Sequence, residues 1–181
     1  HCGVVDRNLE VMTGMIARAR DEWAELIVFP ELALTGYLVD NRYTEAARML
    51  DSPEIRDLVD RSKDIDICFG FIEETSASLF YNSALYLSGG RIAHLHRKIY
   101  LPTYGLFDER RFFGAGWEVS AFDSLIGRSA VLVCGDAWHL PLPYLAAHDG
   151  ADIIYVIAAS SIEGLAETTP GPLIMVLQFV G

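Results

Sequence analysis

The stretch Ala130-Val-Leu-Val-Cys-Gly-Asp-Ala-Trp138 decides the fold of this chain, because it joins a buried strand to a turn. Its first four residues form a continuous apolar run, which is typical of a strand covered on both faces. Cys134 and Gly135 follow, where the strand gives way to a turn that leads toward a helix. Folds of the α/β class place their sites at the carboxyl ends of strands, and backbone N–H groups at such a corner can stabilise a thiolate or an oxyanion. A buried structural cysteine fits the same position, so position alone leaves the role of Cys134 open.

Short apolar runs on both sides of this stretch indicate further strands. These runs are residues 26–29, 67–72, 84–87, 92–96 and 153–158. The sequence Ser88-Gly89-Gly90 supplies a hairpin turn between two of them, because glycine adopts the backbone angles that tight hairpins require. The runs therefore predict a set of strands that are mostly buried.

Helical periodicity separates these runs. Apolar residues at steps of three and four indicate an amphipathic helix over residues 9–23. A second helix is predicted to start at Ser52-Pro53, where a capping residue precedes a proline in the first turn. A third helix, over residues 142–148, is expected to close at Gly150. Helices that alternate with buried strands predict an α/β layered fold with mixed sheets, in one domain over residues 1–181.

The composition limits the classes of function. The chain has 181 residues, of which 51% are hydrophobic, and it carries a formal net charge of −11. A field of that sign repels phosphate backbones and anionic membranes, so no nucleic-acid partner is expected. The apolar run at residues 172–180 is far shorter than the roughly 20 residues that a membrane helix needs, so no membrane partner is expected.

The cysteines and histidines indicate neither a disulfide framework nor a metal site. Cys2, Cys68 and Cys134 are odd in number and form no CxxC pair, which favours a reducing compartment and a cytoplasmic location. Cys68 is expected in the core. His94 and His96 alternate on one strand face without the spacing of metal ligands, so no metal and no cofactor is predicted.

Three charged residues stand where predicted strands or loops end. Glu31 directly follows a buried run, Lys98 ends the strand that begins near residue 92, and Glu109 lies within the charged cluster 108–111. Taken alone, each is typical of a solvent-exposed charge. The functional alternative for Glu31 is a desolvated general base.

Taken together, the sequence blocks around these residues resemble those of the nitrilase (carbon–nitrogen hydrolase) superfamily. The blocks are Phe29-Pro-Glu-Leu-Ala-Leu-Thr-Gly-Tyr37, His96-Arg-Lys-Ile-Tyr-Leu-Pro102 and Val131-Leu-Val-Cys-Gly-Asp-Ala-Trp138, and they occur in the order of that family. Tyr104-Gly-Leu-Phe-Asp-Glu-Arg-Arg-Phe-Phe113 resembles the family's second-glutamate loop. The resemblance covers about residues 4–160 and implies a four-layer α-β-β-α sandwich.

By this resemblance four residues form a catalytic set. Cys134 is the nucleophile, Glu31 the general base, and Lys98 the cation that faces the developing negative charge. Glu109 is the fourth polar residue, which positions Lys98 and the substrate. The chemistry needs these types, because a thiol must become a thiolate to attack an amide or nitrile carbon and a carboxylate can take up its proton.

The same resemblance places Gly135 and Tyr104 on the substrate side of the site. The backbone N–H of Gly135 or Cys134 would stabilise the oxyanion of the tetrahedral intermediate. Family members often carry a bulky or acidic residue after the nucleophile, so Gly135 is expected to leave extra room for substrate.

The sequence also departs from the family pattern at both ends. Members usually have a further strand before the segment that corresponds to Val4-Val-Asp6. They also continue well beyond Ser160, whereas here the pattern gives way to Thr168-Thr-Pro-Gly-Pro172 and a short apolar tail. The chain is therefore expected to lack the first strand and the C-terminal third, which would leave sheet edges open. A homodimer or larger homo-oligomer is expected to cover some of that surface.

The function that the resemblance implies is hydrolysis of a small-molecule amide, or a nitrile, through a cysteine thioester. A glutaminase-like amidase is one alternative, since residues 104–113 and 134–139 are similar to the glutamine-hydrolysing domains of NAD synthetases. An alternative from another class is a catalytically silent fragment or interaction protein that keeps the motif residues without a complete pocket.

Overall fold

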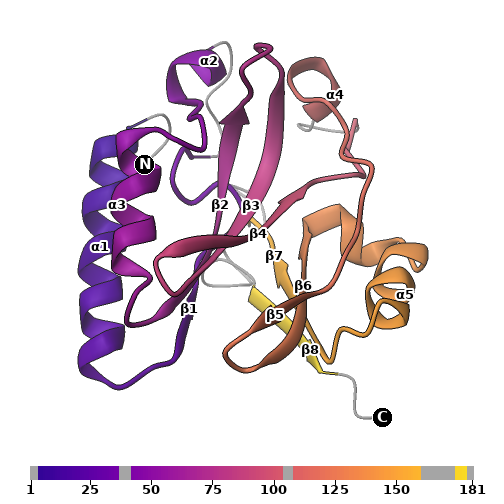
Figure 1. The fold of residues 1–181 in the computed structure, drawn as a ribbon. Helices are drawn as coiled ribbons and strands as arrows, with labels where there is room; N and C mark the ends of the chain where they lie inside the picture. Colours follow the sequence, from indigo (N-terminus) through magenta and orange to yellow (C-terminus); the bar gives the residue numbers. More distant parts are fainter. Residues whose placement is uncertain (1–3, 37–41, 104–107, 160–173, 179–181) are drawn as a thin grey trace, which may run out of the picture.

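The computed structural model describes residues 4–36, 42–103 and 108–159, together with the backbone of residues 174–178 (Figure 1). The helices are α1 (Val5–Asp21), α2 (Tyr43–Ala46), α3 (Pro53–Arg61), α4 (Glu109–Phe112) and α5 (Pro141–His148), with a 3-10 helix η2 at Cys134–Trp138. The strands are β1 (Leu26–Val28), β2 (Asp66–Glu74), β3 (Phe80–Ser88), β4 (Arg91–Arg97), β5 (Phe122–Ser124), β6 (Gly127–Val133), β7 (Ile153–Ile157) and β8 (Ile174–Gln178).

The strands form two mixed four-stranded sheets. The first has the order β1-β2-β3-β4, in which β1 and β2 are parallel and the other neighbours are antiparallel. The second has the order β5-β6-β7-β8, in which only β6 and β7 are parallel. Gly89 and Gly90 both have positive φ angles at the β3–β4 turn, as the predicted hairpin requires.

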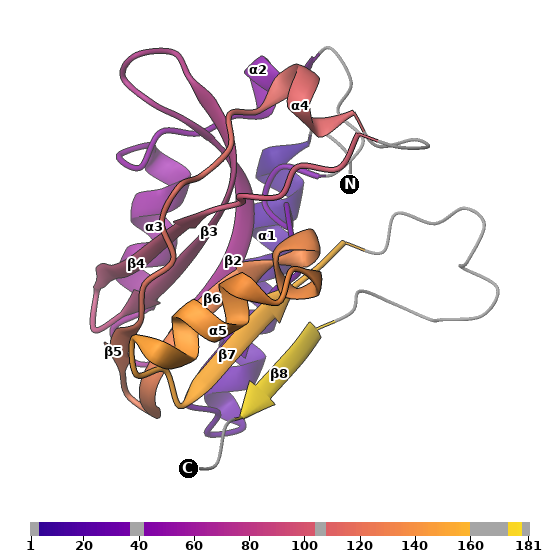
Figure 2. The same cartoon turned by 90° about the vertical axis from the view of Figure 1, so that its right-hand side faces the viewer.

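The two sheets pack face to face between helices, which gives four layers (Figures 1 and 2). Helices α1 and α3 cover the outer face of the first sheet, and α5 covers the outer face of the second. The sandwich predicted from the family resemblance is therefore the observed architecture.

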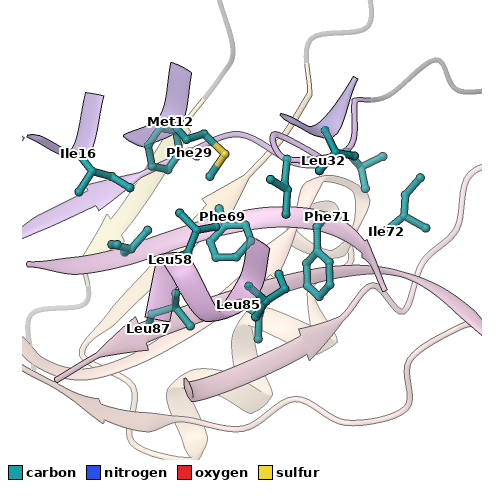
Figure 3. Packing of buried hydrophobic residues seen from close by; sticks show 14 of the residues in the cluster. Met12, Ile16, Phe29, Leu32, Leu58, Phe69, Phe71, Ile72, Leu85 and Leu87 are labelled. Carbon is teal, nitrogen blue, oxygen red and sulfur yellow. The ribbon is translucent and has the colours of Figure 1, made fainter. Parts of the chain in front are cut away.

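Alternation along the strands explains why both faces of each sheet are apolar. On β2, Phe69 and Phe71 face the outer helices while Cys68 faces the second sheet. Figure 3 shows Met12 and Ile16 from α1 packed over the outer face. On β6, Val131 and Val133 face the first sheet, whereas Ala130 and Leu132 face α5. Each large side chain buried in these layers contributes roughly 1.5–3 kcal/mol, so the continuous apolar runs are needed on both faces.

Several elements differ from the expectations drawn from sequence. The short elements β5, α2 and α4 were not predicted. The short apolar tail was not predicted to form a strand. Residues 174–178 nevertheless pair as an antiparallel strand with β7. The predicted turn after Cys134 toward a helix is present: it is the 3-10 helix η2, and α5 follows it. Among the described residues, no helix is both long and apolar enough to cross a membrane.

Candidate active site

Glu31 lies in a tight turn directly after β1 that packs against the neighbouring strand β2. The turn is held by hydrogen bonds from Gly70 N to Pro30 O and from Leu34 N to Gly70 O, each 3.2 Å. A Cβ atom at position 70 would lie 2.7 Å from the Glu31 Cα and 2.3 Å from the Leu32 nitrogen. Only glycine therefore allows the turn to approach β2 this closely, and this approach buries the Glu31 side chain.

The Gly70→Ala variant is expected to lose roughly 2 kcal/mol or more of unfolding free energy, because the added methyl group overlaps backbone that cannot rotate away. It should also lower hydrolytic activity by displacing Glu31. Gly14→Ala is the matched control, since a Cβ there meets nothing within 4 Å in the middle of α1. That control should be unchanged or more stable by about 0.5–1 kcal/mol. Urea unfolding of both variants measures the difference, and equal midpoints would contradict the steric argument.

Lys98 joins Glu31 to Glu109 in a buried cluster. The Lys98 Nζ donates to Glu31 Oε1 at 2.8 Å and to Glu109 Oε1 at 2.9 Å, and all three residues are at most 5% exposed. Burial opposes the charged form of Lys98, but the charges of Glu31 and Glu109 outweigh it and raise the Lys98 pKa above its ordinary value. The lysine is therefore a fixed ammonium at neutral pH.

The two carboxylate oxygens of Glu31 have different environments. Oε1 accepts from Lys98 and also from the Asn82 Nδ2 at 2.8 Å. Within the described residues, Oε2 accepts one hydrogen bond, at 2.9 Å from the backbone N–H of Ala159, two residues after β7. Because Oε1 already takes two strong donors, Oε2 is the oxygen better able to receive a proton. The role of Asn82 was not predicted; the one signal in the sequence is an amide among the mostly apolar residues of β3.

Cys134 stands at the end of β6 with a left-handed backbone, at a φ of 44°. This conformation is strained for a residue with a side chain, and such strained residues are enriched at functional sites. Burial raises the pKa of the thiol to about 11, and the charge of Glu31 adds to the effect, while Lys98 and the Gly135 N–H act in the opposite direction. Cys134 is thus a thiol at rest and needs a base to become a nucleophile.

Asp136 ties the segment after Lys98 to the segment after Cys134. Its Oδ1 accepts from the backbone N–H groups of Ile99 and Tyr100 at 3.1 and 2.8 Å. Its Oδ2 accepts from the His96 Nε2 at 2.8 Å, and both side chains are buried. The sequence predicted no role for Asp136, and His96 was considered only as a metal ligand. One buried carboxylate therefore fixes the distance between the two halves of the site.

A cavity of about 400 Å³ opens beside these residues. It is lined by Glu31, Tyr100, Leu101, Pro102, Thr103, Arg110, Cys134, Gly135, Trp138, His139 and Ala159. Tyr100 and His139 stack with ring centroids 3.4 Å apart, which gives the cavity one flat wall. The cavity combines a base, a thiol and a planar apolar wall, as a small-molecule site requires.

The structure brings most of the sequence-predicted residues together. Glu31, Lys98 and Glu109 are in direct contact, and Cys134 and Gly135 share the cavity wall with Glu31. A Cβ at position 135 would lie 3.2 Å from the Tyr100 carbonyl oxygen, a tight contact, so a side chain there would crowd the Tyr100 backbone. The extra room for substrate at Gly135 stays a prediction. Tyr104 lies outside the described residues. Within the described ranges, no group of three or more histidine, cysteine or acidic residues could hold a metal ion.

The face-to-face sheets with a cysteine at a strand end define the chain as a nitrilase-like sandwich protein. The chain belongs to the carbon–nitrogen hydrolase family, whose family model matches residues 4–174.

Among its relatives, the glutamine-dependent NAD(+) synthetase of Acinetobacter baylyi is 29% identical over 90% of the chain and 30% of the synthetase. A probable nitrilase of Schizosaccharomyces pombe is 28% identical over 84% of the chain and 57% of that protein. The chain thus spans about 30% of the length of the synthetases that it matches.

Solved structures agree on the fold. The glutamine-dependent NAD+ synthetase from Acinetobacter baumannii superposes with a TM-score of 0.79 at 29% identity, covering 92% of this chain and 32% of the synthetase. An amidase from Nesterenkonia sp. superposes with a TM-score of 0.74 at 22% identity, covering 92% of this chain and 64% of the amidase.

Proposed function

We propose that this chain hydrolyses the C–N bond of a small-molecule amide through a thioester on Cys134. The observation that carries the proposal is the Lys98 ammonium held between two buried carboxylates, close enough to Cys134 to alter the pKa of its thiol. Such a fixed cation in a buried site stabilises negative charge that develops on a substrate oxygen.

The contacts suggest a role for each group. Glu31 takes the Cys134 proton as the sulfur attacks the amide carbon, and the resulting oxyanion faces Lys98 and the backbone N–H of Gly135. Glu31 then returns the proton to the departing amine, so that ammonia or an amine leaves and a thioester remains. Water deprotonated by Glu31 hydrolyses the thioester and frees the thiol. Glu109 keeps its hydrogen bond to the Lys98 Nζ throughout these steps.

The test is an ammonia-release screen over aliphatic amides, glutamine, carbamoyl compounds and nitriles. Samples quenched in acid during turnover should show Cys134 heavier by the mass of the acyl group. Cys134→Ala should release no ammonia above buffer. Equal release by that variant would remove the assignment, and no release from any compound would favour the catalytically silent alternative.

A glutaminase-like amidase is the second candidate. It is favoured by the relatives, several of which are glutamine-dependent NAD(+) synthetases at 29–31% identity. Glutamine is therefore the first compound of the screen. A kcat/KM for glutamine well above that for neutral aliphatic amides would select this candidate.

We also propose that residues 1–181 act as one domain in a homo-oligomer in the cytoplasm. Exposed apolar side chains follow one another along η2 and α5, at Trp138, Leu140, Tyr144 and Leu145. A second copy of the chain that packs there would remove them from water. The free thiols of Cys68 and Cys134 suit a reducing compartment. Sedimentation equilibrium tests the assembly, and a mass equal to one chain would rule it out.

A further inference from the structure

Arg110 is a cation on the cavity wall that the reaction described above does not use. It lines the same cavity as Cys134 and Glu31 and is exposed. Within residues 4–36, 42–103 and 108–159, no ion pair joins it to a carboxylate. The neighbouring Arg111 is not part of the cavity wall and instead lies 5.5 Å from the centre of the Phe112 ring.

The charges of the cavity leave Arg110 available for a ligand. Lys98 donates to Glu31 and Glu109, and the proposed reaction assigns its remaining N–H to the oxyanion, so it has no donor left for a distant anionic group on a substrate. Glu31 in turn is engaged by Lys98, Asn82 and the Ala159 N–H. Arg110 is therefore the one lining cation among the described residues whose charge no described carboxylate offsets.

A guanidinium presents a planar pair of N–H donors that matches a carboxylate with two parallel hydrogen bonds. The chain as a whole carries a formal net charge of −11, which repels anions at long range. An anionic substrate thus needs a local cation at the cavity, and Arg110 is placed to supply it.

We propose that Arg110 binds a carboxylate on the substrate, so that the chain acts on amides that carry a free carboxylate away from the scissile bond. The choice of amides rests on the proposed hydrolysis, whereas the carboxylate site itself does not. A first experiment therefore measures the site without any turnover.

Alkylation of Cys134 provides that measurement. Iodoacetyl-glycine and iodoacetyl-β-alanine are each compared with their neutral methylamides, so that the two members of a pair differ in one charge. In each reaction the sulfur–carbon bond forms as the carbon–iodine bond breaks, and iodide leaves. The rates are followed by the mass of the peptide that contains Cys134.

The ratio of the acid rate to the methylamide rate should fall about tenfold in Arg110→Gln, the size of a charge-assisted hydrogen bond that is partly open to solvent. Arg111→Gln is the matched control and should leave the ratio unchanged. Arg110→Lys should recover part of the ratio, because it restores the charge without the planar fork. An equal ratio in Arg110→Gln and Arg111→Gln would overturn the proposal, as would an equal slowing of both reagents in Arg110→Gln.

A second experiment separates this inference from the proposed function. The monoamides of succinic and glutaric acid are compared with butyramide and valeramide, and Arg110→Gln should raise the KM of the acids about tenfold. If the amides are hydrolysed and the preference for the acids over the neutral amides is the same in Arg110→Gln, the carboxylate site is overturned and the proposed hydrolysis is not. If no amide is hydrolysed while the alkylation ratio still depends on Arg110, the hydrolase fails and the carboxylate site stands.

Discussion

The Lys98→Met variant is expected to lose roughly 3–5 kcal/mol of unfolding free energy, because it leaves two buried carboxylates without their shared cation. The side chain is 1% exposed and bridges Glu31 to Glu109, so water cannot replace the ammonium without opening the site. Hydrolysis should fall at least about 100-fold in the same variant, since the oxyanion loses its charged donor. Urea unfolding and ammonia release measure the two effects.

The control for this prediction is Lys63→Met. Lys63 pairs with Asp60 at 2.8 Å on the surface, so its removal should change neither the unfolding midpoint nor activity.

The pKa of Lys98 lies above its ordinary value of 10.5 in the folded chain. Its contribution to stability is therefore complete below pH 10.5 and is lost only as the pH rises through the folded-state value. A loss in Lys98→Met that matches Lys63→Met at neutral pH would show that the cluster is not coupled to folding.

Glu31→Gln should lower hydrolysis by about 10²–10⁴-fold, because glutamine cannot accept the Cys134 proton. The same change should make Cys134 easier to alkylate at alkaline pH. The thiol pKa of about 11 is raised first by burial and next by the charge of Glu31, so removing that charge lowers it. Unfolding of the site would also slow turnover, but it would speed alkylation of the buried Cys68 as well as of Cys134. Faster alkylation of Cys134 alone therefore separates the loss of the Glu31 charge from unfolding.

Glu73→Gln is the matched control for Glu31→Gln. Glu73 is 1% exposed and pairs with Arg97 at 2.6 Å, so it is also a buried carboxylate bound to a cation of the β4 strand. It does not line the cavity. Its replacement should lower the unfolding free energy without changing the pH at which the alkylation rate of Cys134 is half maximal. Identical pH profiles for the two variants would contradict the electrostatic role of Glu31.

The fold could be predicted where apolar runs are long enough to be covered on both faces. The run at 130–133 and the strands 67–72 and 153–158 all became central strands, because their alternate residues fill two different cores. The short elements β5, α2 and α4 were missed since three or four residues carry no period to detect. The strand β8 was missed because its partner β7 is distant in the sequence, and a local pattern does not show which distant segment a strand pairs with.

The charged residues of the candidate site were found by resemblance, and the polar residues that hold them were not. Asn82 interrupts the apolar pattern of β3, and Asp136 follows the nucleophile by two positions, yet neither position reveals its partner. Their hydrogen bonds join residues 51 and 37 positions apart, which only the packing of strands and sheets brings together.

The hydrogen bonds of Asp136 make the site depend on both sheets at once. Lys98 follows a strand of the first sheet and Cys134 follows a strand of the second, so neither sheet alone contains the complete site. Glu31 and the Cys134 sulfur come together only when the two sheets pack and Asp136 accepts hydrogen bonds from the backbone N–H groups of Ile99 and Tyr100. A chain in which only one sheet has formed therefore holds the thiol and its base apart, so hydrolysis should appear only once the whole sandwich has assembled.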